Sequence, residues 1–484
     1  MKKPFTMPFT LHQSVYFALG IVIMKSVSLL MLPIVTRYLS PTQFGHLELL
    51  LSISDFATIL TGFALVDVLY RFAGVSTNEE EEKKIGATTF SLALIICAVS
   101  LVLGMILAPI GLPYLGEGIA LFDLQLVALI ISVEACLLVP LAWMKMRNNA
   151  FSFFILTTGK AICQAVVIWQ SLVMGLGITA ILIGSLVSSV LLVAVLARIQ
   201  WRETGFSLDT KRLPDMFLYC IPLVISGVAT YAIVSGDRWA IAMVSTAEEL
   251  GLYALGKKLA LVSVLLMQPF ILWWLPRRIK QLQEDNGRDS VAHTTSLGIA
   301  LIIGFATMIC IGSPIMIDLF IDHRYTTAMD YVPAVALLYA VKQIAELANL
   351  GCYIGKTTWS VMSIDLGTAA ISIICLVLLS KPFGVAGVLG ALLIAQCTRL
   401  VFFYVLSQRV LYLNYAKGHL FVFGLLGCGL TFMSLQIETV LHHFIMVVFA
   451  TLILVGYLHF SGLLSLNRLL KKQNAASTLN PDGV

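Results

Sequence analysis

The chain has 484 residues, of which 59% are hydrophobic and only 12% are charged. A soluble domain carries about 25% charged residues, so this composition excludes a soluble globular protein. The formal net charge of +5 requires no nucleic-acid partner, because basic loops facing anionic membrane lipid account for it. The composition therefore predicts an integral membrane protein that is surrounded by membrane lipids.

Apolar runs long enough to cross the bilayer recur along nearly the whole chain. Each has about 20 residues, the length needed to span about 30 Å of hydrocarbon. Met1–Thr10 leads directly into the first run without a cleavage site, so we expect this span to stay in the membrane. The sequence predicts an all-α polytopic membrane protein of about 14 transmembrane helices, centred near residues 22, 54, 97, 131, 162, 187, 224, 263, 301, 340, 368, 396, 428 and 450.

The distribution of basic residues orients these helices. With the N-terminus inside, the predicted outer connections hold only Arg37, Arg238, Arg324 and Lys381, and most of the other Lys and Arg residues lie in inner loops. The positive-inside rule then places both termini in the cytoplasm. In the loop after the second span, the run 79–84 (EEEEKK) is typical of solvated surface.

An internal duplication divides the chain. Residues 36–53 align with residues 242–259, and this alignment pairs Gly45 with Gly251. Copies of equal topology are related by an axis along the membrane normal, and the substrate path then lies between the lobes. We expect an N-lobe at 1–205, a C-lobe at 206–410, two extra helices at 411–465 and a disordered cytoplasmic tail at 466–484.

Six basic residues lie inside predicted spans, where each costs about 2.5 to 3.5 kcal/mol at a helix centre. Several share a helix face with other polar residues, as Lys342, Glu346, Asn349 and Tyr353 do in the tenth span. Interhelical ion pairs, or a Lys342–Glu346 pair within one helix, could satisfy individual residues. The simplest partner for the whole set is an anionic substrate. The six are Lys25, Lys160, Lys257, Lys258, Lys342 and Arg399, and the carboxylates in spans are Glu48, Asp55, Glu134, Glu346 and Asp365.

Motifs for catalysis, nucleotide binding and metal binding are missing from the sequence. The nine cysteines lie in or beside apolar runs without a C-x-x-C pair, and the eight histidines lie at boundaries or in loops. No P-loop, nucleophile elbow or H-E-x-x-H motif occurs. We therefore expect no metal, no cofactor, no catalytic residue and no enzymatic activity, and transport driven by an ion gradient or by the substrate's own gradient.

Two sequence strings resemble the polysaccharide transporter family, the Wzx-type flippases of the MOP superfamily. The first is LPIVTRYLSPTQFGHLELLLSISD at 32–55, and the second is DRWAIAMVSTAEELGLYALGKKLA at 237–260. Both lie at the repeat positions. The matched family-motif residues are Leu32, Pro33, Thr36, Arg37, Tyr38, Leu39, Ser40, Pro41, Phe44, Gly45, Asp237, Arg238, Gly251, Tyr253 and Lys258.

This resemblance implies two six-helix lobes around a central cavity, in a flippase of the bacterial cytoplasmic (inner) membrane. Its substrate would be undecaprenyl-pyrophosphate-linked oligosaccharide, such as an O-antigen unit of lipopolysaccharide biosynthesis, carried from the inner to the outer leaflet. A polysaccharide polymerase and a chain-length regulator are the expected protein partners. We predict head-group binding by Lys25, Lys160, Arg238, Lys257, Lys258, Lys342 and Arg399, and ion coupling by Glu48, Asp55, Glu346 or Asp365.

Three other functions remain open at this point. A MATE-like ion-coupled antiporter of small molecules shares the superfamily fold, although a cavity for cationic drugs should be acidic. A membrane polysaccharide polymerase or ligase would handle the same lipid, but such enzymes have a long periplasmic loop. A scaffold that recruits other assembly proteins without transport is the third.

Overall fold

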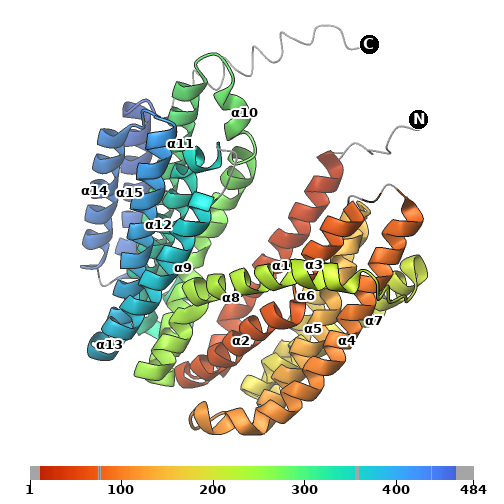
Figure 1. Ribbon diagram of the computed structural model, residues 1–484. Coiled ribbons are helices and arrows are strands. Elements are labelled where there is room, and N and C mark those ends of the chain that lie inside the picture. Colours follow the sequence, from red (N-terminus) through yellow and green to blue (C-terminus); the bar gives the residue numbers. More distant parts are fainter. Residues whose placement is uncertain (1–10, 75, 77, 355–358, 438, 465–484) are drawn as a thin grey trace, which may run out of the picture. The chain divides into compact units, whose positions relative to one another are not determined.

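The computed structural model describes residues 11–74, 76, 78–354, 359–437 and 439–464 (Figure 1). All regular secondary structure in these residues is helical, as the composition predicts. The predicted disordered tail at 466–484 lies outside the described residues.

The chain divides into two compact units, Met1–Gly251 and Leu252–Val484, and the division falls within helix α9. The predicted lobe boundaries near residues 205 and 410 remain predictions. Unit 1 contains α1 (Leu11–Tyr38), α2 (Pro41–Gly62), α3 (Leu65–Val68), the π-helical turn η1 (Leu69–Ala73), α4 (Glu79–Gly111), η2 (Leu112–Tyr114), α5 (Leu121–Met146), α6 (Ala150–Val173), α7 (Ile178–Thr204), α8 (Leu213–Val244) and the start of α9 (Ala247–Trp274).

Unit 2 continues from α9 to the last described helix. It contains α10 (Arg278–Leu282), α11 (Gly287–Phe320), the 3-10 helix η3 (His323–Tyr331), α12 (Val332–Ala348), η4 (Leu350–Tyr353), α13 (Trp359–Val410), α14 (Lys417–Ser434) and α15 (Val440–Phe460). These helices are coloured from green to blue in Figure 1.

Each predicted span lies at a described helix, and one helix, α13, contains two of them. Twelve of the described helices are long and apolar enough to cross a membrane. One of these, α13, has 52 residues and breaks at Gly384 (φ 56°), so it forms two crossing segments. Helix α1, with 28 residues, lies at the first predicted span. Fourteen crossing segments therefore follow from the described helices, and the predicted fold class is confirmed.

Each unit has its own apolar core. In unit 1, Phe90 and Trp143 pack with Leu69 where α4, α5 and η1 meet. In unit 2, Trp274 packs with Ile302 of α11, and Phe423 joins α14 to α11. Many large apolar side chains remain exposed on the outer helix faces. This is the pattern of helices that face lipid, where water does not drive apolar residues inward.

The acidic run at the start of α4 is more than solvated surface. Glu79 accepts from Arg147 at 3.0 Å, and Glu81 accepts from Arg212 at 2.5 Å. Lys84 contacts Asp209 of the α7–α8 connection at 3.1 Å. These ion pairs join three segments at one end of unit 1. Most of the participating side chains are at least a third exposed, and that of Asp209 is 13% exposed.

Candidate functional site

A cluster of charged residues joins α2 and α8 in unit 1. The Arg238 guanidinium lies 3.5 Å from the carboxylate of Glu48 through Nε and 3.2 Å from that of Asp55 through Nη1. Asp237 accepts the main-chain N–H of Arg238 at 2.9 Å. We call Glu48, Asp55, Asp237 and Arg238 the α2–α8 charge cluster. Glu48 is 1% exposed and Arg238 17%, whereas Asp55 is 57% exposed, so the cluster is buried at one side and open at the other.

A hydrogen-bonded tyrosine fixes the same two helices beside this cluster. Tyr231 of α8 donates to the main-chain oxygen of Ser52 at 2.7 Å, and its hydroxyl lies 2.6 Å from the Ser52 hydroxyl. The indole Nε1 of Trp239 donates to Tyr231 at 2.9 Å. Because buried polar groups cost free energy unless they are paired, this network favours one register between α2 and α8.

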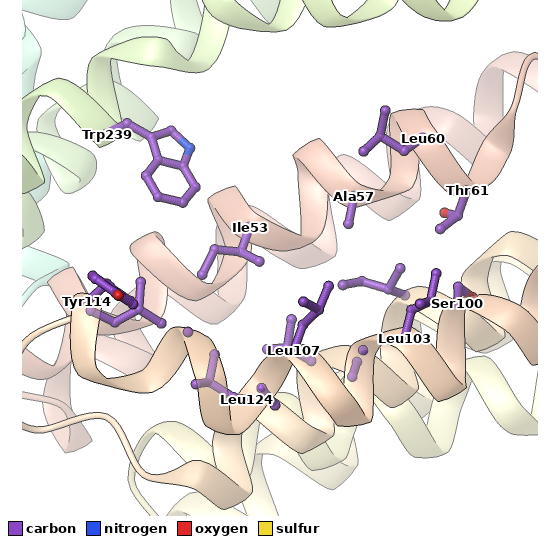
Figure 2. A pocket seen from close by; sticks show the side chains of 17 residues that line it. Ile53, Ala57, Leu60, Thr61, Ser100, Leu103, Leu107, Tyr114, Leu124 and Trp239 are labelled. Atoms are coloured by element: carbon purple, nitrogen blue, oxygen red, sulfur yellow. The ribbon is translucent and has the colours of Figure 1, made fainter.

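Two cavities lie beside α2 in unit 1. The first, of about 490 Å³, is almost entirely apolar and lies between α2, α4 and α5. Figure 2 shows Trp239 at one edge of this cavity, with Ile53 and Leu107 among the side chains that line it. The second, of about 600 Å³, includes the polar side chains of Asp67 and Tyr231. Both cavities are mainly apolar, and the second has more polar side chains in its lining than the first.

A second predicted cation of unit 1 is held by a carboxylate. Lys160 of α6 donates to Glu134 of α5 at 3.2 Å, and Ser189 of α7 lies 3.4 Å from the same oxygen. The Lys160 side chain is 20% exposed and that of Glu134 32%. This pair stays partly accessible.

In unit 2, an ion pair joins the two segments of α13. Arg399 donates through Nε to Asp365 at 2.9 Å, and its guanidinium lies 5.0 Å from the ring centroid of Phe403. Asp365 is 41% exposed. The two residues stand on opposite sides of the Gly384 break, so the pair ties the broken helix together.

Helix α12 carries the polar face that the sequence predicts, but its charged residues are not held in ion pairs within the described chain. The described residues form no ion pair with Lys342 or Glu346, and the two do not pair with each other. Both side chains are half-buried. We call Lys342, Glu346, Asn349 and Tyr353 the α12 polar face.

Arg278 binds this face, and the sequence analysis missed it by counting it among the inner-loop cations. It is 7% exposed and donates through Nη1 to Asn349 Oδ1 at 3.0 Å. No clear signal of its burial is present in the sequence, because α9 ends at Trp274 and α10 begins at Arg278, so no helical periodicity relates Arg278 to the buried face of α9.

The other predicted cations lie in α1 and α9. Lys25 in α1 and Arg37 at its end are exposed, and Lys257 and Lys258 are half-buried in α9. Lys257 lies 6.0 Å from the ring centroid of Tyr253. The predicted head-group residues are therefore spread over α1, α6 and α8 in unit 1 and over α9, α12 and α13 in unit 2, and their joint role stays a proposal.

The motif glycines of the two repeats pack against each other. A Cβ atom on Gly45 would overlap the main-chain oxygen of Ala247, and one on Gly251 would overlap that of Pro41. Pro41 and Ala247 are themselves paired in the repeat alignment, so the contact is symmetric. Glycine is required here because the start of α2 and the start of α9 touch through their backbones. Two further motif residues of unit 1, Pro33 and Asp237, lie in α1 and α8.

A search for groups of His, Cys, Asp and Glu that could hold a metal ion found none in the described residues. Neither a cofactor nor a metal is therefore assigned to the sites above.

Residues 34–272 match the model of a family described as Polysaccharide biosynthesis protein. The search of curated proteins found no match. Together with the fold, the family match confirms the family resemblance that the two sequence strings indicated.

Solved structures with the same fold are flippases and transporters. The lipid II flippase MurJ, in an inward closed conformation, matches with a TM-score of 0.70 and 12% identity over 95% of this chain and 100% of that chain. A mutant of the Vibrio cholerae MATE transporter VcmN matches at 0.52 and 14% over 83% and 95%. An inward-facing multidrug resistance MATE transporter of the MOP superfamily matches at 0.53 and 11% over 81% and 97%. These identities show the fold, and the expectation that the chain is not an enzyme agrees with the family and with these structures.

Proposed function

We propose that this member of the polysaccharide transporter family of the MOP superfamily is a flippase. Its substrate is a lipid-linked oligosaccharide with an undecaprenyl pyrophosphate carrier, such as an O-antigen unit. The proposal is supported by the family match at 34–272, by the fold shared with a lipid II flippase and by charged residues inside membrane-spanning helices.

The observation that carries the proposal is the set of ion pairs within those helices. Lys160, Arg238 and Arg399 each meet a carboxylate, and Glu134, Asp55 and Asp365 are partly exposed. An accessible carboxylate can give up its cation to a stronger anion. A pyrophosphate offers several oxygens for charge-assisted hydrogen bonds, so it can replace these carboxylates in turn as it crosses.

Ion coupling fits the same exchange. When the head group takes Arg238, the carboxylates of Glu48 and Asp55 lose their positive neighbour and gain affinity for a proton or a sodium ion. Asp365 would behave in the same way beside Arg399. Glu346 forms no ion pair with the described residues, so it needs no release from a cation. We propose that such uptake resets the transporter after the substrate leaves.

The multi-pass membrane protein is further proposed to lie in the bacterial cytoplasmic membrane with both termini inside. Transport from the inner to the outer leaflet then delivers the substrate to a polysaccharide polymerase and a chain-length regulator. We further propose that the substrate crosses through a central cavity by alternating access, in which the two lobes rock.

A deletion strain tests the function directly. We expect loss of the gene to leave a lipid-linked glycan in the inner leaflet, and expression of the chain to restore its delivery to the outer leaflet. The glycan that accumulates identifies the substrate. Normal surface polysaccharide in the deletion strain, with no accumulated lipid-linked glycan, would count against a flippase.

A MATE-like antiporter is the second candidate, because Arg238 is flanked by two carboxylates and two MATE structures share the fold. An antiporter of cationic drugs would lower cellular drug accumulation without changing surface polysaccharide. Drug accumulation measured in the same strains separates the two functions.

A further inference from the structure

Arg278 is the one cation among the buried charged residues of the described chain, and the others there are Glu48, Asp123 and Asp237. Removing a charge from water costs several kcal/mol unless an opposite charge or several hydrogen bonds compensate it. The groups that compensate the buried charge of Arg278 therefore have to be identified, whereas water would compensate an exposed loop arginine.

No carboxylate meets this guanidinium in the part of the chain that the structure describes. Its two hydrogen bonds both come from Nη1, to Asn349 Oδ1 at 3.0 Å and to the main-chain oxygen of Glu346 at 3.2 Å. The guanidinium carbon lies 5.5 Å from the ring centroid of Tyr353. Burial lowers the pKa of Arg278, as expected for a charge without a carboxylate beside it.

The end of α12 compensates only part of the charge. A helix C-terminus carries about half a negative charge, and the Glu346 oxygen belongs to the last turn of α12. Arginine has five N–H donors, so Nη2 and Nε keep three N–H groups for which the described residues give no hydrogen bond. Capping of the helix therefore accounts for one nitrogen of the guanidinium.

Lys342 adds a second positive charge on the same face. It lies one turn before Glu346, about 6 Å along the helix axis, and no described residue forms an ion pair with it. The α12 polar face and Arg278 thus combine two full positive charges with the single carboxylate of Glu346. Lys160, Arg238 and Arg399 differ, because each already has a carboxylate within 4 Å.

We propose that Arg278 and Lys342 form a phosphate-binding site on the α12 polar face, which takes the phosphate oxygens of the lipid-linked substrate before any carboxylate is displaced. This inference rests on the proposed function, since it names the residues that first receive the head group. Glu346 limits the affinity of the site and helps the head group to leave.

A binding experiment on the purified full chain tests the site. The probe is undecaprenyl pyrophosphate in detergent micelles, with phosphatidylglycerol and inorganic pyrophosphate as comparison ligands. We expect Arg278→Gln to weaken binding of the probe by tenfold or more, because a charge-assisted contact to phosphate is lost. Lys342→Gln should weaken it by about fivefold, since its ammonium contributes as a point charge.

Arg277→Gln is the matched control. Arg277 is the adjacent arginine with the same charge, but it is exposed and its guanidinium lies 5.3 Å from the ring centroid of Trp273. Binding by this variant should stay within twofold of the wild type. Equal weakening by Arg277→Gln and Arg278→Gln would overturn the site in favour of general attraction to a basic surface.

Glu346→Gln separates a binding site from a helix cap. The substitution leaves the main-chain oxygen that Arg278 uses, so a purely structural role predicts no change in affinity. The site instead predicts binding about threefold tighter, because the competing carboxylate is gone. This variant and Lys342→Gln keep the test decisive where Arg278→Gln fails to fold, and unchanged affinity in both would overturn the proposal.

The comparison ligands identify the source of the phosphate. If Arg278→Gln weakens phosphatidylglycerol as much as the probe, the site serves membrane lipid in general and the assignment to the substrate is wrong. Binding of inorganic pyrophosphate by the wild-type chain without binding of the probe would also show that the assignment to the lipid-linked substrate is wrong. Failure of the proposed function is seen separately, in a deletion strain that the wild-type chain does not correct.

Discussion

The α2–α8 charge cluster of unit 1 and the α12 polar face of unit 2 both place charges in or at the ends of apolar helices, but they compensate those charges differently. Arg238 faces Glu48 and Asp55, whereas Arg278 has an amide oxygen, a main-chain oxygen and an aromatic ring. A cation that already has a carboxylate must exchange partners to bind an anion. A cation without one can bind directly. Under the proposed function, this difference predicts that the head group binds the site without a carboxylate partner before it displaces a carboxylate.

The largest expected effect is loss of the buried ion pair in the α2–α8 charge cluster. Arg238→Gln should lower the free energy of unfolding by about 3 kcal/mol, because removal of one partner leaves a buried charge without its ion pair. Unfolding in mixed micelles measures this. Arg198→Gln, an exposed arginine of α7, is the charge-matched control and should change stability by less than about 0.5 kcal/mol. An equal loss of unfolding free energy in both variants would show that the α2–α8 charge cluster stabilises the protein no more than an exposed arginine does.

The glycine contact beside the cluster should come next. Gly45→Ala inserts a methyl group against the Ala247 main-chain oxygen, and overpacking of this kind costs about 2 kcal/mol. Gly159→Ala in α6 meets nothing within 4 Å and should stabilise the protein by about 0.5 kcal/mol through the unfolded chain. If Gly45→Ala is tolerated as well as Gly159→Ala, the helices do not need this close approach.

A smaller effect is expected where the carboxylate is exposed. Asp365→Asn removes the partner of Arg399, and the exposure of Asp365 (41%) reduces the cost to about 1 kcal/mol. Transport assays with the deletion strain should show a larger change than stability does, because Arg399 becomes free for an anion. A loss of stability as large as that in Arg238→Gln would contradict the distinction between buried and exposed pairs.

The smallest effect belongs to the surface ion pairs of unit 1. A hydrogen bond from Lys84 holds the pKa of Asp209 below its ordinary value, with Arg212 contributing. A depressed folded-state pKa stabilises the protein above the unfolded pKa of about 3.9, and this stabilisation is lost as the pH falls through the folded-state pKa.

Asp209→Asn should therefore lower Tm by about 1 °C at pH 7, and the difference should shrink as the pH falls below the unfolded pKa and through the lowered folded-state pKa. Thermal unfolding at several pH values measures it. Asp215→Asn is the control, since Asp215 is exposed and forms no ion pair with the described residues. A difference that does not shrink as the pH is lowered would show that the Asp209 carboxylate is not the cause.

The sequence by itself determined the membrane fold, the number of crossing segments and the family. Hydropathy acts over about 20 consecutive residues, so each span is visible without knowledge of its neighbours. The two segments of α13 were predicted as separate spans, centred near residues 368 and 396, for the same reason, and the structure places the break between them at Gly384. The repeat alignment also paired Gly45 with Gly251, although it gave no reason why both must be glycine.

Only the tertiary structure decided which charges compensate one another. Arg238 and Asp55 are 183 positions apart in the chain, and Arg278 and Asn349 are 71 apart, so no periodicity within one helix reports these contacts. Lys342 and Glu346 have the spacing of an ion pair, yet they do not form one. Burial of Arg278 accompanies its contacts with Glu346, Asn349 and Tyr353, and a sequence count places it with the exposed arginine next to it.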